Sequence, residues 1–227
     1  HVGAFSGLGA DMYVLAKLHA LYHDLRYTKL LHQLAKQSLT RIGFDTYLDM
    51  LAGSAGLLWV VIQIRSLLAP ALAKKIMDAC VVHIMKNYPK PSVRPPFQTE
   101  DEEGHAEGPI LGFSHGLFGF MTSLTVYNQM FPSAKVTRWL SAAKRYHQTQ
   151  FCDKHKNWPR LGDTPSTVQA ITGYQSTWCH GAPGIGMGLS ALSAHGLGAE
   201  FDDYRKASLQ GTLDNFDQSP LGCLCHG

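Results

Sequence analysis

The feature that most constrains the fold of this 227-residue chain is a Gly-x-x-Gly turn that recurs directly before apolar segments. Clear copies begin at Gly53, Gly116 and Gly181, a weaker copy begins at Gly7, and Gly227 stands where a fifth would begin. The first glycines are 46 to 65 residues apart, which leaves room for one helical hairpin in each interval. Repeats of this length are typical of helical arrays in which each unit buries its apolar face against its neighbours.

Apolar residues between the turns recur with helical spacing, and no stretch shows the two-residue period of a strand. The segment from Leu51 to Ile64 is apolar nearly all round, which predicts an inner, buried helix, and Pro70 is well placed to open the helix after it. Three further faces are predicted to be buried: Val14, Leu18, Leu21 and Leu25; Leu72, Ile76, Ala79 and His83; and Val136, Leu140 and Ala143. The sequence therefore predicts an all-α fold, and the uneven spacing of the turns favours a closed α/α toroid of helical hairpins over an open solenoid.

Charge and cysteine content exclude several classes of function. The formal net charge is only +3 and the basic residues are scattered, so we expect no nucleic-acid partner. The longest apolar stretch, 51–64, has 14 residues, fewer than the roughly 18 expected of a transmembrane segment, and no secretory signal opens the chain. Five cysteines make a disulfide framework improbable and favour metal-binding or reactive thiols in the cytoplasm.

Two Cys-His dipeptides stand immediately before Gly-x-x-Gly turns or their remnant, at 179–180 and 225–226. Zinc prefers four tetrahedral ligands from cysteine and histidine, and a catalytic zinc site keeps one position open. Cys179, Cys225 and His226 would supply three ligands and leave the fourth position for a substrate thiol, which metal coordination deprotonates. If His180 is a fourth ligand, the site is closed and structural; buried cysteines also often serve only as small apolar side chains.

Two other residues are candidates for catalytic assistance. His115 occupies the same place before its turn as His180 and His226 do, and an imidazole suits general acid or base work near neutral pH. The alternative is a hydrogen-bonded histidine that stabilises a turn. Asp49, four residues before Gly53, would orient a histidine or stabilise a cationic acid, although an ordinary helix-start role fits nearly as well.

Together these motifs resemble successive signatures of the LanC-like lanthionine cyclases over the whole chain, and most closely the C-terminal cyclase domain of class II (LanM-type) lanthipeptide synthetases. The segments that carry the resemblance are Gly3-Ala4-Phe5-Ser6-Gly7-Leu8-Gly9, 49–56, Gly112-Phe113-Ser114-His115-Gly116, 178–186 and Cys225-His226-Gly227. The resemblance implies a single LanC-like domain over residues 1–227, built as an α/α toroid.

The resemblance also implies a reaction and its participants. One zinc ion would be held by Cys179, Cys225 and His226, with assistance from His115 and Asp49. The reaction is Michael addition of peptide cysteine thiols to dehydroalanine or dehydrobutyrine in a dehydrated precursor peptide, which forms (methyl)lanthionine thioether rings. A dehydratase domain upstream in the same chain is the expected partner.

The chain departs from the LanM pattern at several positions. His147, Arg160 and Gly162 stand where acidic residues and an arginine are expected, and Gln175 stands where stand-alone cyclases often have an arginine. Two other functions therefore stay open, a non-catalytic zinc and thiol-peptide binding module and glutathione addition to dehydroamino acids. A first and a last repeat of the family pattern are missing, so we expect a fragment with an incomplete toroid and weak or no cyclisation by these residues alone.

Overall fold

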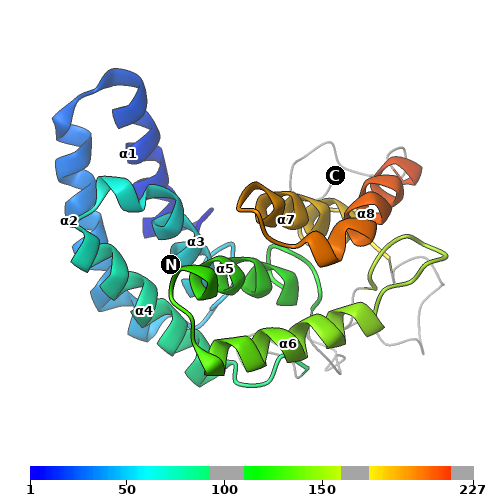
Figure 1. The fold of residues 1–227 in the computed structure, drawn as a ribbon. Coiled ribbons are helices and arrows are strands. Elements are labelled where there is room, and N and C mark those ends of the chain that lie inside the picture. The colour runs from blue at the N-terminus through cyan, green and yellow to red at the C-terminus, as the bar shows by residue number, and fades with distance from the viewer. Residues whose placement is uncertain (93–109, 160–173, 216–227) are drawn as a thin grey trace, which may run out of the picture. The chain divides into compact units, whose positions relative to one another are not determined.

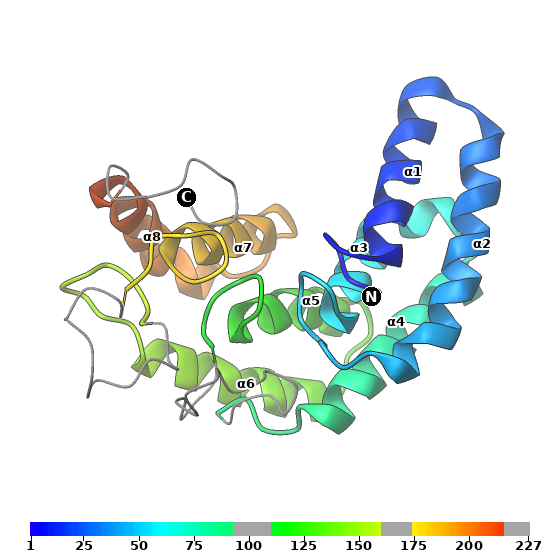
Figure 2. The same ribbon diagram turned by 180° about the vertical axis from the view of Figure 1, so that it is seen from behind.

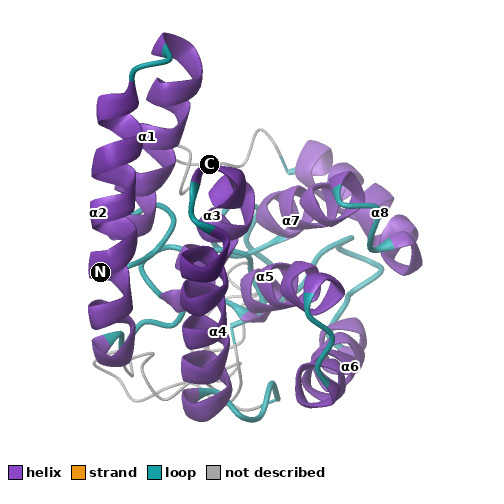
Figure 3. Ribbon diagram, turned by 60° about the vertical axis from the view of Figure 1, so that its left-hand side comes forward, coloured by secondary structure: helices purple, strands orange, loops and turns teal. Residues whose placement is uncertain are grey.

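The computed structural model describes residues 1–92, 110–159 and 174–215. In this part the chain forms eight α-helices and three short 3-10 helices, and the described residues contain no β-strand, only two isolated bridges (Figures 1 and 3). The chain divides into two compact units, His1–Pro89 and Lys90–Gly227. The predicted all-α architecture of helical hairpins with Gly-x-x-Gly turns is confirmed, while the assignment of all 227 residues to one domain stays a prediction.

The first unit consists of two helical hairpins. Its helices are α1 (Leu8–Tyr22), α2 (Leu25–Arg41), α3 (Ser54–Ile64) and α4 (Pro70–Asn87). Helix α1 packs against α2 and α3 packs against α4, while α1 also contacts α3 and α2 also contacts α4. Helix α3 is buried along almost its whole length, as expected of an inner helix with apolar side chains on all sides.

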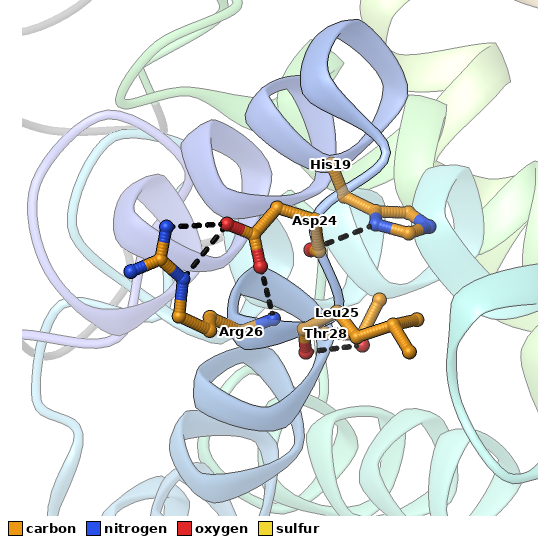
Figure 4. Close-up of polar contacts among 5 residues, drawn as sticks. All are labelled: His19, Asp24, Leu25, Arg26 and Thr28. Atoms are coloured by element: carbon orange, nitrogen blue, oxygen red, sulfur yellow. Dashed lines mark hydrogen bonds and ion pairs between the residues drawn. The ribbon is translucent and has the colours of Figure 1, made fainter.

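The turn between α1 and α2 is short and held by polar contacts (Figure 4). Its residue His23 adopts a left-handed backbone conformation, and Asp24 caps α2 by accepting a hydrogen bond from the amide of Arg26 at 2.8 Å. The Arg26 guanidinium pairs with the same carboxylate at 2.6 Å. The His19 ring lies 3.2 Å from the carbonyl of Asp24, so both helices contribute to the turn.

The second unit repeats this plan with two more hairpins. Its helices are α5 (Leu117–Met130), α6 (Ala134–Thr149), α7 (Ala182–Ala194) and α8 (Asp202–Asp214). Helix α5 pairs with α6, α7 lies alongside α8, and α5 contacts α7 (Figure 2). Each unit thus places two inner helices in contact, which is the packing from which an α/α toroid is built.

The burial pattern confirms the predicted inner helix and parts of the predicted faces of α4 and α6. Helix α3 lies within the apolar segment 51–64, and α4 begins at Pro70 as predicted. On α6, Val136 and Ala143 are buried, whereas Leu140 is half-buried. On α4 the prediction is only partly correct, because Ile76 is buried whereas the other predicted residues are half-buried and the stripe passes through Ala73, Met77, Cys80 and Ile84.

The predicted face of α1 is wrong. Val14, Leu21 and Leu25 are 55%, 72% and 74% exposed and Leu18 is half-buried, whereas the residues that α1 buries are Gly9, Met12 and Ala16. Leu25 does not even belong to α1, because that helix ends at Tyr22. Apolar residues lie on several sides of α1, so periodicity does not single out one face, and packing against α2 and α3 decides which side is buried.

No helix among the described residues is both long enough and apolar enough to serve as a transmembrane span.

Candidate functional site

A recurring loop geometry precedes the inner helices. Helices α1, α3 and α5 each have a glycine at the N-cap, and an amide in the first helical turn donates to the carbonyl seven residues earlier. These bonds join Leu8 to His1 at 3.3 Å, Ala55 to Leu48 at 2.9 Å, and Leu117 to Ile110 at 2.8 Å. The equivalence of the sequence repeats therefore extends to the hydrogen bond that closes these three loops.

Within each unit the two loops pack backbone to backbone through glycine. In the first unit the Gly3 amide donates to the Ala52 carbonyl at 2.8 Å, and a Cβ atom on Gly56 would overlap Met50 and Ala4. In the second unit a Cβ atom on Gly112 would overlap the carbonyl oxygen of Cys179. Only glycine permits so close an approach, which explains these positions in the motifs.

The contact in the second unit brings together two residues of the predicted site, His115 and Cys179, and the alternative ligand His180. The loop of His115 lies against the Cys179-His180 dipeptide, and the His115 and His180 rings are 5.8 Å apart between centroids with an interplanar angle of 31°. Cys179 is 3% exposed, whereas His115 and His180 are half-buried. Two loops about 65 residues apart in the sequence thus converge on a thiol and two imidazoles.

The other two predicted metal ligands, Cys225 and His226, lie outside the described residues. Within the part of the chain that is described, no group of three or more His, Cys, Asp or Glu side chains has a metal-binding arrangement. Cys179 itself suits a zinc ligand, because it is a thiol outside any disulfide and stands two residues before the N-cap of α7. Thiolate is a preferred zinc ligand, and the positive end of a helix dipole stabilises negative charge.

Asp49 is buried in the first unit, where its side chain stabilises a turn. Its Oδ1 accepts hydrogen bonds from the amides of Ala52 at 2.8 Å and Gly53 at 3.2 Å. Both amides precede α3, whose N-cap is Gly53, so these bonds stabilise the turn that leads into the helix rather than capping the helix itself. Asp49 belongs to the first compact unit and His115 and Cys179 to the second, so a catalytic role for Asp49 stays a prediction.

Asn157 is a residue of this site that the sequence analysis missed. Its Oδ1 accepts hydrogen bonds from the amides of Trp158 and Ala182, both at 2.8 Å, and its Nδ2 donates to the Gln175 carbonyl at 3.1 Å. The partners Gln175 and Ala182 flank Cys179 on either side and lie 18 and 25 residues from Asn157. No local motif signals contacts over such sequence separations.

His147, one of the departures from the LanM pattern, lies in the interior of the second unit. Its ring lies 5.0 Å from that of Phe118 and 4.8 Å from that of Trp158, between centroids. Burial lowers the pKa of His147 to about 3, and a hydrogen bond with the backbone of Leu111 only partly opposes this shift. The side chain is therefore neutral near pH 7. Arg160 and Gly162, the other two departures, lie outside the described residues.

The remaining cysteines differ in environment. Cys80 is fully buried on α4, and burial raises the pKa of its thiol. Cys152 lies near the surface, and a hydrogen bond with Tyr174 and the amide of His155 lower the pKa of its thiol. Cys223 lies outside the described residues.

The family described as lanthionine synthetase C-like protein has a model that matches residues 1–227. Because the match extends over the whole chain, the protein belongs to the lanthionine synthetase C-like family.

Proposed function

We propose that this chain carries a zinc-dependent cyclase site that forms (methyl)lanthionine rings in a dehydrated precursor peptide. The observation that carries the proposal is the approach of the His115 ring to His180, beside the buried Cys179. The reaction needs a metal ligand and a proton-transferring group close to the same reacting atoms. The Cys179 loop would supply the ligand and the His115 loop the proton-transferring group.

The proposed metal ligands are Cys179, Cys225 and His226, with one zinc ion and an open fourth position. When bound, zinc would supply a Lewis acid that keeps a substrate thiol deprotonated at neutral pH. The chain contributes a rigid ligand loop, since Cys179 is buried and its loop is held by hydrogen bonds through Asn157.

His115 is proposed as the proton donor. In the addition, the C–S bond forms as the carbon–carbon double bond of the dehydroamino acid is lost, and the α-carbon then takes a proton. A ring nitrogen of His115 would deliver that proton, because imidazole exchanges protons near neutral pH and this ring is half-buried beside the Cys179 loop. Asp49 is proposed to assist, in addition to capping its turn.

The metal ligand and the proton donor are tested by separate measurements. We expect Cys179→Ala to lose bound zinc, measured by elemental analysis, while the matched variant Cys152→Ala keeps the wild-type stoichiometry. We expect His115→Asn to keep zinc but to cyclise a dehydrated peptide about 100-fold more slowly. Equal zinc in Cys179→Ala would refute the metal ligand, and an unchanged rate in His115→Asn would refute the proton donor.

One observation favours a second function, a non-catalytic zinc and thiol-peptide binding module. His147 occupies a position where the LanM pattern has an acidic residue, yet it is neutral and packed between aromatic rings.

Cyclisation leaves the peptide mass unchanged and removes thiols that iodoacetamide would alkylate, whereas glutathione addition raises the mass. A binding module retains the peptide with its mass and its thiols unaltered. Assays with and without glutathione therefore separate the three functions.

The proposal has two implications for the setting of the reaction. The substrate contains dehydroamino acids, so a dehydratase activity must act before this site, in the same chain or in a partner. Free peptide thiols are required for the addition, so the proposal also implies a reducing compartment such as the cytoplasm.

A further inference from the structure

The loop that carries Cys179 is closed in a different way from the loops before α1 and α5. In those two loops the amide of the first helical residue donates directly to the carbonyl seven residues earlier. In the Cys179 loop the amide of Ala182 donates instead to Asn157 Oδ1, and Asn157 Nδ2 donates to the Gln175 carbonyl, which is the one seven residues earlier. The carboxamide of Asn157 is thus inserted into the hydrogen bond that closes the other loops.

The α3 loop provides a partial parallel. There the first helical amide, that of Ser54, also donates to a side chain, at 2.7 Å from Asp45 Oδ2. That loop keeps the direct bond from Ala55 to Leu48 as well. The Cys179 loop is therefore closed through Asn157, a residue of another segment. The α3 loop keeps a direct closing bond in addition to its contact with Asp45.

Asn157 is itself rigidly held. It is 1% exposed, and its backbone exchanges two hydrogen bonds with Cys152, at 2.9 and 3.3 Å, across a tight turn. The next residue, Trp158, is also buried, and its indole donates to the His147 carbonyl at 3.0 Å. The carboxamide is thus fixed to the C-terminal end of α6 before it reaches the Cys179 loop.

We propose that Asn157 is a positioning residue that holds the loop of Cys179 from both sides and thereby fixes where the thiol stands. The hydrogen-bonding role of Asn157 stands on the geometry alone. Its importance for zinc binding rests on the proposed function. Without the carboxamide, the amides of Trp158 and Ala182 and the carbonyl of Gln175 would each lose a hydrogen-bond partner. Buried polar groups without partners are costly, so the loop would open or rearrange.

The test compares Asn157→Ala with a matched variant, Asn128→Ala. Asn128 is also an asparagine that ties a turn in the second unit, because it accepts from the Ser133 amide at 2.9 Å and donates to Thr137 at 3.0 Å. Its turn joins α5 to α6 rather than leading to Cys179. A general loss of stability should therefore affect both variants, whereas disruption of the Cys179 loop should affect only Asn157→Ala.

The first readout is the rate at which iodoacetamide alkylates Cys179 in the metal-free chain at one pH, mapped by peptide mass. We expect Asn157→Ala to raise this rate by about tenfold or more through local opening of the loop. We expect the wild-type rate in Asn128→Ala. Cys80, which is fully buried in the first unit, serves as an internal control for global unfolding and should stay protected.

The second readout is zinc affinity, measured by competition with a chromophoric chelator. We expect Asn157→Ala to bind zinc about 10- to 100-fold more weakly, the usual cost of losing a group that orients a metal ligand. The proposed function fails if the wild-type chain binds no zinc, and the alkylation rates then still decide whether Asn157 holds the loop. Wild-type alkylation and zinc affinity in Asn157→Ala would overturn the positioning role.

A second variant covers the case in which Asn157→Ala exposes Cys80 and has therefore unfolded. Asn157→Asp keeps an oxygen for the amides of Trp158 and Ala182 but cannot donate to the Gln175 carbonyl. We expect it to raise Cys179 alkylation less than the alanine variant, with Cys80 still protected. A rate equal to the wild type in Asn157→Asp would overturn the role of the Gln175 contact.

Discussion

Each buried polar side chain near the glycine loops could have more than one role. Asp49 was a candidate for catalysis or for starting a helix, and its Oδ1 accepts from two amides of its own turn. Asn157 belongs to none of the sequence motifs, yet it bridges segments on both sides of Cys179. The residue type limits the possible roles of such a side chain, and its hydrogen-bonding neighbours in the fold determine which role it has.

The buried His147 makes stability depend on pH. Its pKa is about 3 in the folded chain against 6.5 as the ordinary value, so between these values the unfolded chain binds a proton that the folded chain does not. The free energy of unfolding should therefore fall as pH falls below 6.5, by about 1.4 kcal/mol per pH unit. Urea denaturation at pH 7 and pH 5 measures this loss.

The contribution of His147 is isolated by comparing two glutamine variants. We expect His147→Gln to show a smaller loss of stability between pH 7 and pH 5, because glutamine does not titrate. His155→Gln, at an exposed position in the same unit, should retain the wild-type loss. A loss in His147→Gln as large as that of the wild type would show that other groups cause it.

At the scale of helices and loops, the predictions succeeded where the apolar pattern allowed one packing arrangement and failed where it allowed several. Helix α6 has a single apolar stripe and buries Val136 and Ala143 as predicted. Helix α1 has apolar residues on several sides, and its buried face was assigned incorrectly. The inner helix α3 was predicted correctly because side chains that are apolar all round have no alternative to burial.

The glycine contacts between paired loops should contribute strongly to stability. A Cβ atom on Gly56 would overlap the backbone of Met50 and Ala4, which cannot move without disturbing both loops. We expect Gly56→Ala to destabilise the chain by more than about 2 kcal/mol in chemical denaturation. Gly43→Ala is the matched control, because a Cβ atom there has no neighbour within 4 Å, and it should change stability by less than about 0.5 kcal/mol. Equal stability of the two variants would contradict the close packing of the loops.

At the scale of the whole molecule, charge predicts what the chain does not bind. Its 20 basic and 17 acidic residues leave a formal charge of only +3. Non-specific binding to DNA needs several phosphate contacts from clustered cations. We expect no retention of a duplex oligonucleotide in a gel-shift assay at about 0.15 M salt, near physiological ionic strength. Retention that weakens steeply with added salt would reveal a basic surface that the sequence does not suggest.

The sequence by itself determined the all-α class, the glycine turns before the inner helices, and the equivalent places of His115 and His180 in their repeats. These features are local, because turn conformation and helical period depend on residues close together in the chain. Only the tertiary structure decided which side of α1 is buried, that Gly112 lies on the Cys179 carbonyl, and that Asn157 closes the Cys179 loop. Those features depend on contacts between segments far apart in the sequence, where packing and the pairing of buried polar groups choose among locally equivalent arrangements.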